Sequence, residues 1–169
     1  MTTYDTTPTT PYALGPDQGD HLHFLNHLAT VKVRPGEVGA MSAIEFVAPR
    51  GFGPPLHCHD NEDEVMVILD GEINFRSGDD EFTGSAGTTV YLPHGVPHTF
   101  QVLSETARFS TITAATSGQP RFASMVDTLG EATEGATLPT PTEIDPGQVA
   151  AVCGANGIEV LGPPPPPLD

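Results

Sequence analysis

Basic residues are scarce in this chain of 169 residues. It holds six Lys and Arg against 22 Asp and Glu, which gives a formal net charge of −16 at pH 7. Binding to nucleic acids or anionic membranes relies on clustered Lys and Arg, so the composition disfavours both kinds of partner. A site for a phosphorylated sugar is also hard to assemble from so few basic groups.

Cysteine and long apolar stretches are rare as well. Cys58 and Cys153 are too few for a disulfide framework. No stretch reaches the roughly 18 apolar residues of a membrane-spanning helix, and the N-terminus MTTYDTTPTTPYALG lacks the basic and apolar regions of a signal peptide. No Gly-rich dinucleotide fingerprint is present, so we expect neither NAD nor flavin. These absences predict a cytoplasmic protein.

Short β-prone runs separated by turn residues dominate the middle of the chain. EVMVILDG, GTTVYLP, HTFQVLS and ARFSTITA follow one another at regular spacing, and GEINFRSG is expected to form a hairpin with the first of them. The pattern predicts an all-β sandwich or barrel over residues 21–116, after an irregular, Thr- and Pro-rich segment at 1–20. At this length, one domain with a single core is the simplest organisation.

The hydrophobic period changes after residue 117. RFASMVDTLG carries its apolar residues at helical spacing and ends at Gly130. Asp145 and Pro146 are typical of the first positions of a second helix, and the tail GPPPPPLD is typical of polyproline II structure that needs no core. We therefore expect residues 117–169 to form an extension whose helices pack outside the β body.

Three histidines and one glutamate form the candidate site. Alternate residues of a strand share a face, so His57 and His59 point the same way and Cys58 points away. The turn-like DNED resets this alternation before Glu64, and His98 begins a later strand after the PHGVP turn. Three imidazoles and a carboxylate suit one divalent transition metal ion, and they do not choose among Fe, Ni, Mn, Co, Cu and Zn.

The spacing of these residues resembles the two motifs of the cupin superfamily. The first motif is matched by Gly51, His57, His59, Glu64 and Gly71, and the second by Gly87, Pro93, Gly95 and His98. The last position of the second motif is Asn in the family pattern and Val102 here, which makes the floor of the site more apolar. The resemblance implies a single cupin jelly-roll β-barrel that holds a metal ion in its mouth through the three histidines and Glu64.

The sequence also suggests where other side chains near the two motifs lie. Four apolar residues either line a substrate cavity or fill the barrel: Phe46, Met66, Ile68 and Phe100. Three acids beside the first motif are expected in a solvated turn: Asp60, Glu62 and Asp63. The histidines upstream of the motifs are not expected to bind metal: His21, His23 and His27.

The order of segments is similar to that of bacterial single-domain quercetin 2,3-dioxygenase-like proteins, because the FASMVDTLG helix and the GIEVLGPPP tail follow one cupin. This resemblance implies oxidative cleavage of a flavonol or related phenolic substrate by O2, with Glu64 both as metal ligand and as the base that accepts the substrate's hydroxyl proton. Two alternatives stay open: a redox-neutral cyclase or isomerase that uses the metal as a Lewis acid, and a non-catalytic cupin that binds a small ligand. A homodimer is compatible with the resemblance, since many cupins pair through sheet edges.

Overall fold

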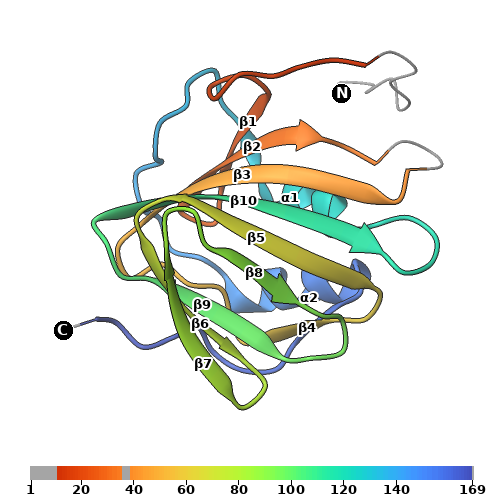
Figure 1. The fold of residues 1–169 in the computed structure, drawn as a ribbon, viewed down its shortest axis with the longest axis vertical. Coiled ribbons are helices and arrows are strands. Elements are labelled where there is room, and N and C mark those ends of the chain that lie inside the picture. The colour runs from red at the N-terminus through yellow and green to blue at the C-terminus, as the bar shows by residue number, and fades with distance from the viewer. Residues whose placement is uncertain (1–10, 36–38, 169) are drawn as a thin grey trace.

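Two antiparallel sheets build the molecule, as expected for a jelly-roll barrel (Figure 1). The computed structural model describes residues 11–35 and 39–168, so the first ten residues of the predicted N-terminal segment lie outside it. The larger sheet has the order β11-β1-β2-β3-β10-β5-β8. Its strands are β1 (Asp20–Phe24), β2 (His27–Val33), β3 (Met41–Pro49), β5 (Glu62–Asp70), β8 (Thr89–Leu92), β10 (Thr106–Ala115) and β11 (Glu131–Ala132). The smaller sheet has the order β12-β4-β9-β6-β7, with β4 (His57–His59), β6 (Glu72–Ser77), β7 (Asp80–Ser85), β9 (His98–Val102) and β12 (Ile158–Val160).

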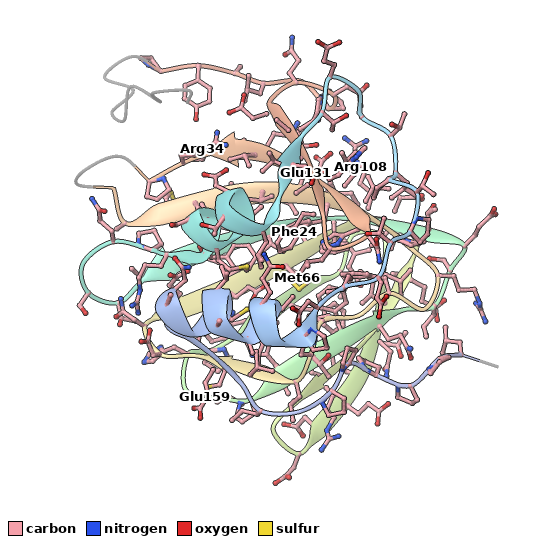
Figure 2. All side chains as sticks on the ribbon, turned by 180° about the vertical axis from the view of Figure 1, so that it is seen from behind. Phe24, Arg34, Met66, Arg108, Glu131 and Glu159 are labelled. Atoms are coloured by element: carbon pink, nitrogen blue, oxygen red, sulfur yellow. The ribbon has the colours of Figure 1, made fainter. Side chains whose placement is uncertain are left out.

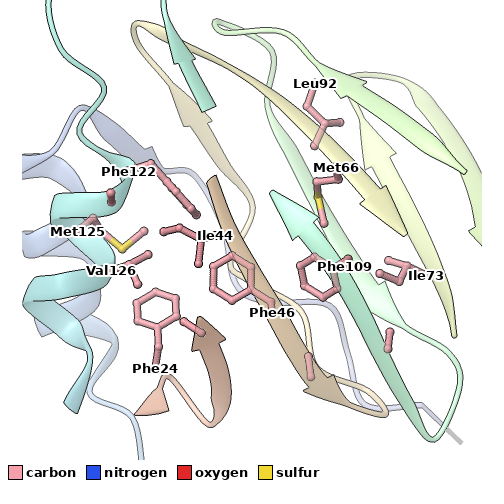
Figure 3. Close-up of a cluster of buried hydrophobic side chains, with 14 of the residues drawn as sticks. Phe24, Ile44, Phe46, Met66, Ile73, Leu92, Phe109, Phe122, Met125 and Val126 are labelled. Atoms are coloured by element: carbon pink, nitrogen blue, oxygen red, sulfur yellow. The ribbon is translucent and has the colours of Figure 1, made fainter. Parts of the chain in front are cut away.

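The core lies between the sheets and follows the alternation of the strands. On β3, β5 and β10 every second side chain is buried, which is the pattern of strands that cover a core with one face. Phe109 and Phe75 come from opposite sheets and are 1% and 0% exposed; burying each such side chain stabilises the fold by about 1.5–3 kcal/mol. Figure 3 shows how the rings of Phe46 and Phe109 follow one another through this cluster.

The predicted hairpin between EVMVILDG and GEINFRSG is wrong. These segments are β5 and β6, which belong to different sheets, and β6 pairs with β7 and β9. Gly71 joins them with φ of 85°, and a Cβ there would lie 2.5 Å from the carbonyl oxygen of Thr106. This conformation and this closeness are open only to glycine, and they allow the chain to cross from one sheet to the other.

Two helices follow the strands, as predicted. Helix α1 (Phe122–Leu129) ends before Gly130, and α2 (Pro146–Ala155) begins after Asp145, whose carboxylate accepts a hydrogen bond from Gly147 N at 2.8 Å. Both lie outside the strands on one side of the molecule (Figure 2), and the inner side chains of α1 pack toward Phe24 and Phe46 (Figure 3). No helix in the described ranges is long and apolar enough to cross a membrane.

The C-terminal tail is attached to the barrel more closely than its composition suggests. After α2 the chain returns as β12, which pairs with β4 through the register Ile158↔His59 and Val160↔His57. Beyond it, the carbonyl oxygen of Pro163 accepts a hydrogen bond from Leu56 N at 3.3 Å, and Pro166 O accepts one from Gln101 Nε2 at 2.7 Å. Proline keeps its carbonyl acceptor, so the prolines of this segment accept hydrogen bonds from the barrel although they have no N–H to donate.

Candidate metal centre

Three strands bring the predicted metal-binding residues together. His57 and His59 lie on β4, Glu64 on β5 and His98 on β9, and the register places His57 directly opposite His98. One ligand atom from each of the four side chains lies within 4.8 Å of the others. A single ion with ligands at about 2.0–2.2 Å can bridge such a group after small side-chain adjustments.

Backbone carbonyls fix the orientation of two of the imidazoles. His57 Nδ1 lies 2.8 Å from Pro55 O and His98 Nδ1 lies 3.0 Å from Val96 O, so each Nδ1 donates its proton and leaves Nε2 as a lone-pair donor. Among the described residues, no hydrogen-bond partner meets His98 Nε2 or either ring nitrogen of His59, and all three atoms are buried. Buried polar atoms are normally paired, so these nitrogens fit the ligands of a metal ion.

The electrostatics of the cluster differ among its members: burial would lower the pKa of His98, but the interaction with Glu64 raises that pKa above its ordinary value. Burial alone would raise the pKa of Glu64, but its interaction with His98 and the charges of His59, His98 and His57 lower that pKa to about 2. Burial, with the neighbouring His98 and His59, lowers the pKa of His57 to about 3. Metal ligands must be deprotonated, and at neutral pH Glu64 is therefore an anion and His57 a neutral imidazole.

A cavity of about 400 Å³ opens beside the cluster, and His57, Glu64 and His98 form part of its wall. The rest of the lining is largely apolar and includes six aromatic side chains: Phe24, Phe46, Phe52, Phe100, Phe109 and Phe122. Apart from the cluster, the side chains in its described lining that carry nitrogen or oxygen are His27 and Thr111. His59 is 1% exposed and stands behind this wall.

The four apolar residues proposed from the sequence divide into two pairs. Phe46 and Phe100 line the cavity, whereas Met66 and Ile68 do not. Met66 and Ile68 are both 0% exposed and fill the packed part of the barrel farther along β5. Strand alternation places all four toward the interior, but it does not say where along the barrel the packed core ends and the cavity begins.

The C-terminal segment supplies a wall of the cavity that sequence reasoning assigned to the exterior. Helix α2, the loop before it, β12 and the tail contribute the following lining residues: Ile144, Pro146, Val149, Cys153, Ile158, Val160 and Pro163. The alternation of Ile158 and Val160 in GIEV was the available signal, but three residues are too few to identify a strand by pattern.

His27 also lines the cavity, and no pattern in the sequence indicated this position. It lies outside the metal cluster, as do His21 and His23, yet it is only 3% exposed and lines the cavity. Its ring centroid lies 4.1 Å from that of Phe52 and 5.0 Å from that of Phe24. Burial lowers the pKa of His27 from 6.5 to about 4, although the hydrogen bond with the Leu25 carbonyl opposes this shift.

The lowered pKa of His27 predicts acid sensitivity. Below pH 6.5 the unfolded chain binds a proton at this imidazole and the folded chain does not, so stability falls with pH until the folded form is protonated near pH 4. The shift corresponds to about 3 kcal/mol. His27→Phe should therefore gain about 3 kcal/mol relative to the wild type between pH 7 and pH 4, measured by urea unfolding at each pH. A constant difference between the two proteins over this range would contradict the prediction.

The acids beside the first motif do not all lie in a solvated turn. Glu62 begins β5 and is 3% exposed, because its carboxylate accepts hydrogen bonds from the backbone N–H groups of Arg121 and Phe122 at the start of α1. Its pKa is raised by burial, although these hydrogen bonds oppose the shift. Asp60, at the surface, pairs with Arg121 at 2.6 Å. Glu62 differs from Asp60 because the N-terminus of α1 covers its carboxylate.

Known proteins are similar to this chain over the region that contains the two motifs. Residues 43–113 match the family model described as "Cupin domain". Quercetin 2,3-dioxygenase of Bacillus subtilis (strain 168) is 26% identical over 104 residues, which are 61% of this chain and 31% of that enzyme; the chain thus spans about a third of the length of this curated relative. The crystal structure of an RmlC-like cupin from Shewanella frigidimarina NCIMB 400 has the same fold, with a TM-score of 0.54 and 12% identity, over 64% of this chain and 93% of that one.

The fold and the motif residues agree with these similarities. The matched region runs from β3 to β10 and contains both motifs. The motif spacing predicts a jelly roll in which three histidines and one glutamate converge. The structure has both the two-sheet jelly roll and this cluster inside it. Residues 43–113 of this chain are therefore a cupin domain.

Proposed function

We propose that this protein is a metal-dependent dioxygenase that cleaves a flavonol or a related phenolic compound with O2. The observation that carries the proposal is the position of the cluster of three histidines and Glu64 at the wall of an aromatic-lined cavity. The 26% identity to a quercetin 2,3-dioxygenase supports the reaction class.

The cavity fits a flat aromatic molecule better than a sugar or a phosphate ester. Its volume of about 400 Å³ lies in the usual range of small-molecule sites, roughly 300–1,000 Å³. No Lys or Arg belongs to its described lining, so an anionic substrate group would meet no cation there except a bound metal. Phenylalanine faces such as those of Phe100 and Phe109, whose ring centroids are 5.3 Å apart, offer aromatic contacts instead.

The residues of the cluster have separable roles in this proposal. His57, His59, Glu64 and His98 would hold a divalent transition metal ion. When bound, the ion supplies Lewis acidity toward an anionic oxygen of the substrate. Glu64 is the only carboxylate in the described lining of the cavity, and a carboxylate has a second oxygen with which to take the hydroxyl proton of the substrate.

Oxygen uptake is the experiment that tests the proposal. Protein loaded separately with iron, nickel, manganese or cobalt is mixed with quercetin, and O2 consumption is compared with loss of flavonol absorbance. Equal consumption of both with at least one metal is the expected result, and His57→Ala should abolish it. Absence of uptake at confirmed metal loading would reject flavonol cleavage and favour a redox-neutral cyclase or isomerase.

A further inference from the structure

His27 occupies a position for which the metal centre gives no reason. It begins β2, and β3 and β10 lie between β2 and the strand that carries Glu64. With neighbouring strands about 4.8 Å apart, this separation is about 14 Å along the sheet. The imidazole therefore lines the cavity from a strand that is three positions away from the strand of Glu64 in this sheet.

The hydrogen bond of His27 determines which of its nitrogens is free. Nδ1 lies 3.2 Å from the carbonyl oxygen of Leu25, which can only accept, so Nδ1 carries the proton of the neutral ring. Nε2 then holds a lone pair and has no hydrogen-bond partner among the described residues. Because Nδ1 is turned to the backbone, Nε2 is the polar atom that this cavity-lining side chain offers to a ligand.

The surroundings of His27 are aromatic, and an apolar ring would pack there equally well. Its ring packs among Phe24, Phe46 and Phe52. A phenylalanine would fill the same space, whereas His27 adds a nitrogen to an otherwise apolar part of the cavity lining. The turn before it is also unusual, since Leu25 and Asn26 both have positive φ, 47° and 66°. Such a conformation is strained for Leu, and strained residues concentrate at functional sites.

We propose that His27 Nε2 accepts a hydrogen bond from a hydroxyl group at the end of an aromatic ligand that lies away from the metal centre. The cavity then selects phenols with two oxygen-bearing ends, one directed to the cluster and one to His27. This inference rests on the proposed function only in that an aromatic molecule enters the cavity, and it does not depend on oxygen chemistry.

Binding of a matched pair of ligands tests the inference. 2-Naphthol and 2-methoxynaphthalene share an aromatic skeleton, but only the first can donate a hydrogen bond. We expect metal-loaded wild-type protein to bind 2-naphthol about 5- to 10-fold more tightly by titration calorimetry. His27→Phe should bind both compounds equally while its affinity for 2-methoxynaphthalene stays unchanged, and His27→Gln, whose amide oxygen can accept, should recover part of the preference.

The ¹⁵N resonance of His27 Nε2 gives a readout in the wild-type protein that needs no variant. It should move on addition of 2-naphthol and not on addition of 2-methoxynaphthalene. A preference for 2-naphthol that survives in His27→Phe would assign the accepting group to the metal centre and overturn the inference. Failure of both compounds to bind, or an unmoved Nε2 resonance with 2-naphthol bound, would overturn it too. Because no step consumes O2, these results are independent of the oxygen-uptake experiment.

Discussion

Glu64→Gln is expected to lower metal-dependent O2 turnover by a factor of about 10² to 10⁴, which is the usual contribution of a positioned general base. Gln has nearly the same shape, but it lacks the negative charge and takes up no proton at neutral pH. The loss of the anion should also weaken metal binding by roughly tenfold or more, since neutral His57 and His59 leave Glu64 as the anionic ligand of the cluster. Both quantities are measured, turnover by oxygen uptake and metal affinity by competition with a chelator.

Glu62→Gln is the matched control for this variant. Glu62 is a buried carboxylate on the same strand and the same face, two residues earlier, but it accepts hydrogen bonds from the start of α1 and is not part of the cluster. A Gln oxygen can accept the same bonds, so metal affinity and turnover should stay close to the wild type. Turnover by Glu64→Gln within a factor of about three of the wild type, at equal metal occupancy, would show that Glu64 does not act as a base.

Removal of the residues after Gly157 is expected to have the largest effect on stability. The cut deletes β12, whose Ile158 is 3% exposed, and with it the backbone pairing along one edge of β4. It also removes the hydrogen bond from Leu161 N to Leu56 O, 2.7 Å long. Loss of a buried Ile costs about 2–5 kcal/mol by itself, so we expect a total of about 4 kcal/mol and a fall in Tm of about 8–16 °C.

The same truncation should weaken metal binding, although it removes no member of the cluster. β4 carries two of the histidines, and its pairing with β9 extends over the single register pair His57↔His98. Without β12 this short strand is held on one side only. A chain that ends at Pro167 keeps β12 and the contact between Gln101 and Pro166, and it serves as the control. Equal melting temperatures and metal affinities for the two truncated chains would contradict the prediction.

Residue spacing was sufficient to predict the cluster because each motif position has a strong local reason. Alternation puts His57 and His59 on one face, and glycines with positive φ, such as Gly71 and Gly95, allow the turns that bring the strands together. The start of α2 was equally local, because the Asp145 carboxylate caps the helix by its own side-chain chemistry.

The errors arose where the partner of a segment lies far away in sequence. A strand has the same period in either sheet, so nothing in GEINFRSG says that it pairs with β9 instead of β5. Glu62 was expected at the surface because it stands among acids, and the helix end that buries it begins about 60 residues later.

The pairing of β4 with β12 has a consequence for biosynthesis. The chain is made from its N-terminus, and domains fold as their segments emerge from the ribosome. β12 is the last strand of the described chain. Its neighbour β4 comes much earlier in the sequence and carries two of the clustered histidines, His57 and His59. The nascent polypeptide therefore acquires most of its barrel before it can complete the edge that steadies the imidazoles. Metal capture should accordingly follow the emergence of β12 from the ribosome.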